Sequence, residues 1–130
     1  FVDWVFYNVT DGEYVIGHGG GAHMQHTYCT PISWDEAQPG DLVFYPGDQH
    51  VGIVGGRDEA GNLLIIHCAF SQNNVLLAWK ALLLSANQSI TINRIKGLRE
   101  GIILCPLSKL YSFVYSDEYW HHCLLLETYS

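Results

Sequence analysis

The chain has 130 residues, of which 48% are hydrophobic, so its size and composition are those of one domain with a buried core. Its net charge of −7 argues against a surface for nucleic acid or anionic membranes, because such surfaces need an excess of Lys and Arg. No apolar run comes close to the length of about 18 residues that a helix needs to cross a bilayer. The four cysteines match no zinc motif and define no disulfide framework.

The first eight residues have the pattern of a helix with one buried face, because apolar side chains stand at positions 1, 2, 5 and 6. No capping residue precedes Phe1. We therefore expect the natural helix to begin upstream of the printed sequence.

A glycine-rich loop follows over residues 17–26 and is expected to enter a short helix at its end. Residues 28–32 predict an extended connector, because Pro31 disfavours the helical conformation in the residue before it. Ser33 then predicts a capped turn over residues 33–37, with two acidic residues in its first turn.

Three apolar runs predict strands. The runs over residues 42–45 and 51–54 are separated by Pro-Gly-Asp-Gln and bounded by glycine-containing pairs, which is the pattern of two paired strands. A polar turn over residues 57–62 leads to a third apolar run over residues 63–69. The second and third strands should therefore form an antiparallel hairpin.

One histidine, His50, lies just before the first strand of this hairpin, and another, His67, lies near the end of its second strand. If Ile53 pairs with Leu64, His50 faces His67, and opposed residues have Cβ atoms about 4.5–5.5 Å apart on one sheet face. A slip of one residue would place the two imidazoles on opposite faces.

The histidine pair has two interpretations. In the first, the two residues are structural and their ring nitrogens are satisfied by nearby backbone groups. In the second, one imidazole is a general base and the other fixes its tautomer. The second interpretation needs a nucleophile, which is best placed at a helix N-terminus because the helix dipole there favours a thiolate.

Three segments of the sequence resemble one family when they are taken together. They are Pro-Gly-Asp-Leu-Val-Phe at residues 39–44, His-Val-Gly-Ile at residues 50–53 and Ile-His-Cys-Ala at residues 66–69. In this order and spacing they resemble the NlpC/P60 cysteine peptidases, papain-like enzymes that cut the stem peptides of cell-wall peptidoglycan. The resemblance covers about residues 1–74.

The resemblance implies an α+β, papain-like NlpC/P60 fold in which a small antiparallel sheet packs on helices, here incomplete. It implies that His50 is the catalytic general base and that His67 is the polar residue that orients it. The implied partners are peptidoglycan stem peptides, with no cofactor or metal and no nucleic acid. The implied location of the parent protein is extracellular or in the cell envelope.

The nucleophile of the family lies in the sequence Asp-Cys-Ser-Gly, directly before the first helix. The printed sequence starts just after that place, so we expect these residues to lack the nucleophile and to be inactive. Cys29 lies in an extended segment, and alternation along the strand directs Cys68 away from the face of His67, so neither is expected to replace it. The alternative function is a noncatalytic module that binds peptidoglycan.

A metal site is a third interpretation. His23, His26 and Cys29 have a spacing that a metal could use, and His121, His122 and Cys123 add further ligands of suitable chemistry. No fourth ligand is indicated for the first group, and the same residues could instead belong to a loop that lines a substrate groove.

The composition changes abruptly near residue 75. Residues 1–74 have a net charge of −8, 11 glycines and 3 leucines, whereas residues 75–130 have a net charge of +1, 2 glycines and 12 leucines. We therefore divide the chain into an NlpC/P60-like domain over residues 1–74 and an unassigned tail over residues 75–130. Within the tail, residues 75–84 have the pattern of an amphipathic helix and residues 102–105 that of a strand.

One hypothesis for the tail is translation out of frame from about codon 75. Suitable codons in a neighbouring frame would spell a glycine-rich, tyrosine-ended string that resembles the closing strands of the same family. The nucleotide sequence tests this hypothesis, because a frame change near codon 75 must restore such a string.

Overall fold

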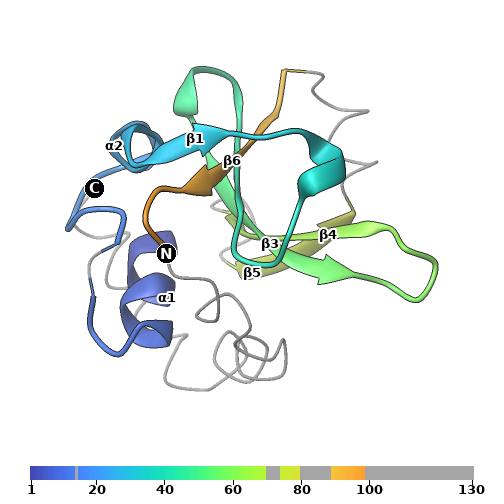
Figure 1. Cartoon of the computed structure of the whole chain (residues 1–130), viewed down its shortest axis with the longest axis horizontal. Helices are drawn as coiled ribbons and strands as arrows, with labels where there is room; N and C mark the ends of the chain where they lie inside the picture. The colour runs from blue at the N-terminus through green and yellow to red at the C-terminus, as the bar shows by residue number, and fades with distance from the viewer. Residues whose placement is uncertain (14, 70–73, 80–88, 99–130) are drawn as a thin grey trace.

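The computed structural model describes residues 1–13, 15–69, 74–79 and 89–98, in which two short helices accompany a six-stranded antiparallel sheet (Figure 1). The strand order is β1-β6-β2-β3-β4-β5. This arrangement confirms the predicted α+β class. The helices, single 3-10 turns and strands are α1 (Val2–Val9), α2 (Ala22–Thr27), β1 (Cys29–Pro31), η1 (Trp34–Glu36), β2 (Leu42–Phe44), η2 (Pro46–Asp48), β3 (Val51–Arg57), β4 (Leu63–Ala69), β5 (Asn74–Trp79) and β6 (Thr91–Ile95).

Helix α1 confirms the helix predicted at the start of the chain. Its side chains Val2, Val5 and Phe6 are buried, as their spacing on one helix face requires. The helix ends at Thr10, whose hydroxyl donates a hydrogen bond of 2.7 Å to the Phe6 carbonyl. Asp11 then takes a left-handed conformation with a φ of 56°, which turns the chain away from the helix axis.

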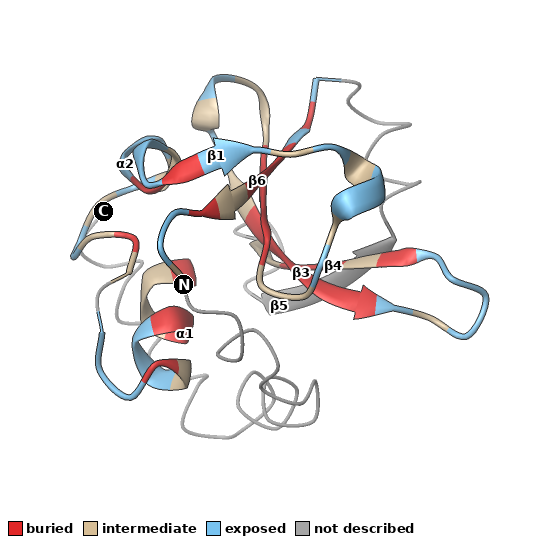
Figure 2. Ribbon diagram, in the orientation of Figure 1, coloured by how far each residue is buried: buried red, intermediate tan, exposed pale blue. Residues whose placement is uncertain are grey.

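The sheet buries side chains on both faces. On one face, residues such as Leu42, Phe44 and Ile53 pack with the buried side of α1. On the other face, residues such as Val43 and Val54 pack beneath the segment that contains η1. Figure 2 shows buried residues on one side of α1 and along β3, β4 and β6.

The turn predicted after Ser33 is confirmed as η1. The backbone amide and the hydroxyl of Ser33 donate hydrogen bonds to Glu36 Oε2 at 3.1 Å and 3.0 Å. The bond from the Ser33 backbone amide to Glu36 is one half of a capping box, which holds the segment that covers the second face of the sheet.

Strands β3 and β4 form the predicted antiparallel hairpin, but in a different register. Ile53 pairs with Ile66 and not with Leu64, so the predicted register is wrong by two residues. On the turn side, Gly56 pairs with Leu64, which is three residues from the prediction, and a bulge between Val54 and Gly56 reduces the difference to two. On the histidine side of the bulge, the even shift leaves the side chains on their predicted faces.

Strands β5 and β6 come from the segment that the composition set apart. The helix predicted for residues 75–84 is wrong over its first part, because Asn74–Trp79 forms strand β5 beside β4. Strand β6 lies between β1 and β2 and buries Ile92 and Ile95. Residues 80–84 and the strand predicted over residues 102–105 lie outside the described residues.

An ion pair ties β6 to the loop before β2. Arg94 donates hydrogen bonds of 2.9 Å from Nε and from Nη2 to the two carboxylate oxygens of Asp41, which is almost fully buried. A third bond of 2.9 Å runs from Arg94 Nη2 to the Glu36 carbonyl.

Over the ranges described, no helix has the length and apolar character needed to cross a membrane.

Candidate active site

His50 lies directly before β3, at the end of the tight turn η2. The turn contains two left-handed residues in succession, Gly47 with a φ of 65° and Asp48 with a φ of 53°. The Tyr45 amide donates a hydrogen bond of 3.0 Å to the His50 carbonyl, which closes the turn. The Pro-Gly-Asp sequence suits this geometry, because Gly and Asp tolerate positive φ better than most residues.

His67 meets His50 across the hairpin. Nε2 of His50 lies 3.0 Å from Nδ1 of His67, and the two rings are close to perpendicular, with an interplanar angle of 79°. In the observed register His67 is opposite Gly52, so the position facing it carries no side chain. The predicted meeting of the two imidazoles is therefore confirmed, although they are diagonal neighbours and not a directly opposed pair.

Gly52 is needed for this arrangement. A Cβ atom at residue 52 would lie 2.7 Å from Ile65 Cγ2, 3.2 Å from the Ile66 carbonyl oxygen and 3.5 Å from His67 Cβ. Ile65 is fully buried and has little room to move. Glycine at this position thus leaves room for the Ile65 side chain on the strand that carries His67.

Both imidazoles favour the neutral form. Burial lowers the pKa of His50, and the neighbouring His67 lowers it further. Burial also lowers the pKa of His67. A single proton between His50 Nε2 and His67 Nδ1 makes this contact a hydrogen bond. When that proton is bound to Nε2 of His50, Nδ1 of the His50 ring carries a lone pair. A neutral ring with a free lone pair and a fixed tautomer can act as a general base.

Tyr45 packs against both imidazoles. Its ring is edge-on to His50, with ring centroids 4.9 Å apart, and tilted relative to His67, with centroids 6.5 Å apart. Burial raises the pKa of Tyr45, so its phenol stays protonated. Its hydroxyl is buried and has no hydrogen-bond partner among the residues that the structure describes. In the sequence, Tyr45 is marked only as the last residue of the apolar run over residues 42–45.

A pocket of about 280 Å³ lies between the start of α1, the start of α2 and the hairpin. His50 contributes to its wall, and so do Phe1 and Val2 at the beginning of α1. The other lining residues are Gly20, Gly21, Ala22, Gln25, Gln49, Val51 and Cys68. The pocket therefore brings the start of the first helix and His50 to one cavity.

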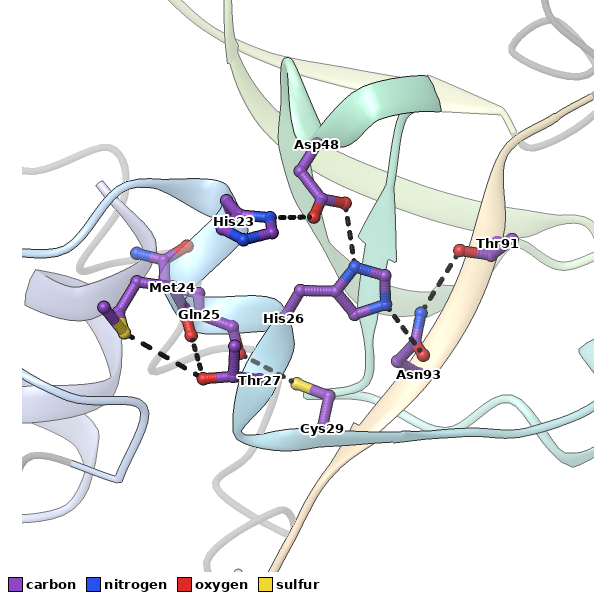
Figure 3. Close-up of polar contacts among 9 residues, drawn as sticks. All are labelled: His23, Met24, Gln25, His26, Thr27, Cys29, Asp48, Thr91 and Asn93. Carbon is purple, nitrogen blue, oxygen red and sulfur yellow. Dashed lines mark hydrogen bonds and ion pairs between the residues drawn. The ribbon is translucent and has the colours of Figure 1, made fainter.

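Helix α2 holds η2 through a carboxylate that sequence reasoning missed (Figure 3). Nδ1 of His26 and Nδ1 of His23 lie 2.8 Å and 3.0 Å from the two oxygens of Asp48. The other ring nitrogen of His26 lies 3.3 Å from Asn93 Oδ1 on β6, and its ring stacks on Phe44 with centroids 4.0 Å apart. We call Asp48 with His23 and His26 the α2 clamp, and it fixes the turn that ends at His50.

The metal interpretation of His23, His26 and Cys29 does not agree with this geometry. The two imidazoles bind opposite oxygens of Asp48, while the thiol of Cys29 points to the Gln25 carbonyl at 3.4 Å. Within the described ranges, no group of three or more His, Cys, Asp or Glu side chains could hold a metal ion. His121, His122 and Cys123 lie outside those ranges.

The two described cysteines differ in their surroundings. Cys29 is buried, and its burial raises the pKa of the thiol to about 12, so it has no thiolate character at neutral pH. Cys68 is partly exposed and lines the pocket, whereas its neighbour His67 contacts His50 and Tyr45. Cys68 thus lines the same pocket as His50, and the predicted orientation of its thiol away from His67 stays a prediction.

Comparisons of the chain with protein-family models, with curated proteins and with solved structures found no match. A function must therefore be inferred from the His50–His67 pair and from the pocket beside it.

Proposed function

We propose that this domain hydrolyses peptide bonds in the stem peptides of cell-wall peptidoglycan, as a papain-like cysteine peptidase of the NlpC/P60 type. The observation that supports the proposal most directly is the 3.0 Å contact between His50 Nε2 and His67 Nδ1. His50 is the general base and later the general acid, and His67 holds its tautomer. The activity implies an extracellular or cell-envelope location for the parent protein.

The proposed reaction has two steps. Nδ1 of His50 takes the proton of a thiol, the thiolate attacks the carbonyl carbon of the peptide, and the same proton passes to the departing amine. Water then hydrolyses the thioester, with His50 again accepting and returning a proton. The lowered pKa of His50 suits the first step, because the ring must be neutral to accept a proton.

The thiol is proposed to stand three positions before Phe1, where the family resemblance places it. A helix rises about 1.5 Å per residue, so three residues before Phe1 span less than one turn beyond α1. Phe1 and His50 line the same pocket, which supports a thiol at that place reaching the imidazole. The printed residues alone are proposed to bind peptidoglycan without cutting it.

Three forms of the chain test the proposal. The first has only the 130 residues of the printed sequence, and the second carries Asp-Cys-Ser-Gly directly before Phe1. The third is the matched control and carries Asp-Ser-Ser-Gly at the same place. We expect only the form with the cysteine to release new amino groups from purified sacculi, and iodoacetamide to block the release. Cleavage by the printed chain, or no cleavage by the folded cysteine form, would contradict the proposal.

A noncatalytic peptidoglycan-binding module is the alternative. The pocket supports this alternative, because the amide side chains of Gln25 and Gln49 in its wall can bind a peptide without any nucleophile. For such a module, the printed chain sediments with sacculi, and the cysteine form binds equally well without cutting.

A further inference from the structure

Tyr45 lies opposite His50 at the turn end of the β2–β3 pair. Phe44 pairs with Val51, so Tyr45 and His50 occupy the next position on the two chains. The hydrogen bond of 3.0 Å from the Tyr45 amide to the His50 carbonyl continues the pairing by one step. Opposed residues of an antiparallel pair carry their side chains on the same face. The backbone therefore holds the Tyr45 ring beside the His50 imidazole.

The rings of Tyr45, His50 and His67 form one cluster. Ring centroids are 4.9 Å apart for Tyr45 and His50, 6.5 Å for Tyr45 and His67, and 5.2 Å for the two imidazoles. The planes of Tyr45 and His50 differ by 68°, which is the edge-to-face arrangement that aromatic pairs prefer. Tyr45 also packs against the buried cluster that contains Val43 and Val54. Its ring thus joins the core of this sheet face to the imidazole pair.

The His50 imidazole needs such a contact to stay in place. In the part of the chain that the structure describes, the hydrogen bond of this ring joins its Nε2 to His67 Nδ1. A single hydrogen bond between neutral groups adds little net stability, because water competes for both partners. A half-buried ring held by that bond alone would exchange between rotamers. Packing against Tyr45 disfavours the other rotamers, which keeps Nε2 on His67 and leaves Nδ1 free to accept a proton.

The hydroxyl of Tyr45 is not suited to contact a substrate. Its oxygen is buried and has no hydrogen-bond partner among the residues that the structure describes. Tyr45 is also not one of the residues that line the pocket beside His50. A molecule in the pocket therefore cannot reach this hydroxyl, and Tyr45 can act on a reaction there only through His50.

We propose that Tyr45 is a positioning residue whose aromatic ring keeps the His50 imidazole on His67, while its hydroxyl takes no part. The reaction is the proposed peptide hydrolysis, so this inference rests on the proposed function. Phenylalanine should serve equally well at this position, and an aliphatic residue should not. Tyr45→Phe also removes an unpaired buried polar group, so it should leave the fold at least as stable.

The first test observes the His50 ring of the printed chain by NMR, above the ordinary histidine pKa of about 6.5. The 15N chemical shifts of the ring distinguish its two tautomers. We expect the natural chain and Tyr45→Phe to show one tautomer, with the proton on Nε2. Tyr45→Leu and Tyr45→Met lack the ring and should show shifts averaged over both tautomers. Tyr28→Leu is the matched control at a tyrosine that is 40% exposed, and it should resemble the natural chain.

The second test measures cleavage of a soluble stem peptide by the form with Asp-Cys-Ser-Gly before Phe1. Tyr45→Leu and Tyr45→Met should lower kcat about ten- to hundredfold, because the base is no longer held in line with the thiol. KM should change less than about threefold, since Tyr45 does not contact the substrate. Tyr45→Phe and Tyr28→Leu should keep kcat within about twofold of the natural residue. Circular dichroism verifies that each variant is folded.

A measurement on the natural chain does not depend on the folding of the aliphatic variants. The ring protons of Tyr45 and His50 should give mutual nuclear Overhauser effects, and Tyr45→Phe should preserve them. Their absence would overturn the inference. So would a loss of kcat in Tyr45→Phe as large as in Tyr45→Leu, or an unchanged tautomer and kcat in folded Tyr45→Leu and Tyr45→Met.

The result is separable from the proposed function. A His50 tautomer that depends on the Tyr45 ring, together with no cleavage by the cysteine form, supports the positioning role and contradicts the peptidase. Cleavage by that form that is insensitive to loss of the Tyr45 ring supports the peptidase and contradicts the positioning role.

Discussion

Two pairs of histidines in this molecule have opposite surroundings. His50 and His67 contact each other, and the structure shows no direct ion pair between either ring and a carboxylate in the part it describes. His23 and His26 instead share the carboxylate of Asp48. The same side chain thus occurs once as a neutral pair that can exchange a proton and once as a partner of a fixed negative charge.

The carboxylate determines the difference. Burial raises the pKa of Asp48, but the hydrogen bonds from His26 and His23 outweigh it, so the pKa of this carboxyl is lowered overall. Asp48 therefore keeps its charge and holds η2 in place. Without such a charge, burial lowers the pKa of His50 and keeps the ring available as a base. The clamp orients the segment, and the neutral pair carries the proposed chemistry.

The largest contrast between the two pairs should be in activity. In the chain with Asp-Cys-Ser-Gly before Phe1, we expect His50→Gln to lower the rate of cleavage of sacculi by a factor of about 10² to 10⁴, because the general base is lost. His26→Gln should lower it less than about tenfold, since it acts only through the turn. Equal losses for the two variants would remove the distinction between the pairs.

Gly52→Ala should disturb the neutral pair through packing. The new Cβ atom would meet the buried Ile65 and approach His67, so we expect a loss of about 1–3 kcal/mol in the free energy of unfolding. NMR signals of the His50 and His67 rings should shift, while those of His23 and His26 stay in place. Gly21→Ala is the control, because its Cβ would meet no atom within 4 Å. Unchanged His67 signals in Gly52→Ala would contradict this account of the hairpin.

Asp48→Asn should weaken the clamp and spare the pair. Asn tolerates the left-handed backbone of residue 48 but cannot accept two charge-assisted bonds, so denaturant unfolding should show a loss of about 1 kcal/mol. The 3.0 Å contact of His50 with His67 should persist, which ring signals in NMR can verify. A stability equal to that of the natural chain would mean that the clamp contributes nothing to the fold.

The smallest expected effect is a difference in pH dependence. The pKa values of His50 and His67 lie below the ordinary 6.5, so the unfolded chain binds protons first and stability falls as the pH drops below about 6.5. The lowered pKa of Asp48 contributes stability that is lost only as the pH falls below its ordinary 3.8. Chemical denaturation across pH should show the first loss disappear in His50→Gln/His67→Gln and the second in Asp48→Asn.

The hairpin shows how far local pattern reaches. Apolar alternation and the Pro-Gly-Asp turn predict β2, β3 and β4, and the predicted hairpin register places His50 and His67 on one face. The exact pairing differs because the strands leave the turn three residues out of the predicted register and a bulge between Val54 and Gly56 takes back one residue, and no local residue pattern reports either feature. The two imidazoles still lie on one face, because the strand pairing on their side of the bulge differs from the prediction by an even number of residues, two.

The α2 clamp shows where local pattern stops. His26 and Asp48 are 22 residues apart, and His26 and Asn93 are 67 residues apart, so no short motif contains them. Strand β6, which supplies Asn93, comes from a segment whose composition suggested no place in the sheet. The Pro-Gly-Asp turn is the one local signal that could have drawn attention to Asp48.

The sequence by itself determined the first helix, the capped turn after Ser33, the β3–β4 hairpin and the common face of the His50 and His67 imidazoles. These features follow from 3.6-residue and two-residue periodicities and from turn chemistry, which act between near neighbours in the chain. Only the tertiary structure decided the insertion of β6, the hold of α2 on Asp48 and the pocket between α1, α2 and the hairpin. Those depend on contacts between distant segments, whose geometry is fixed only when the whole sheet is assembled.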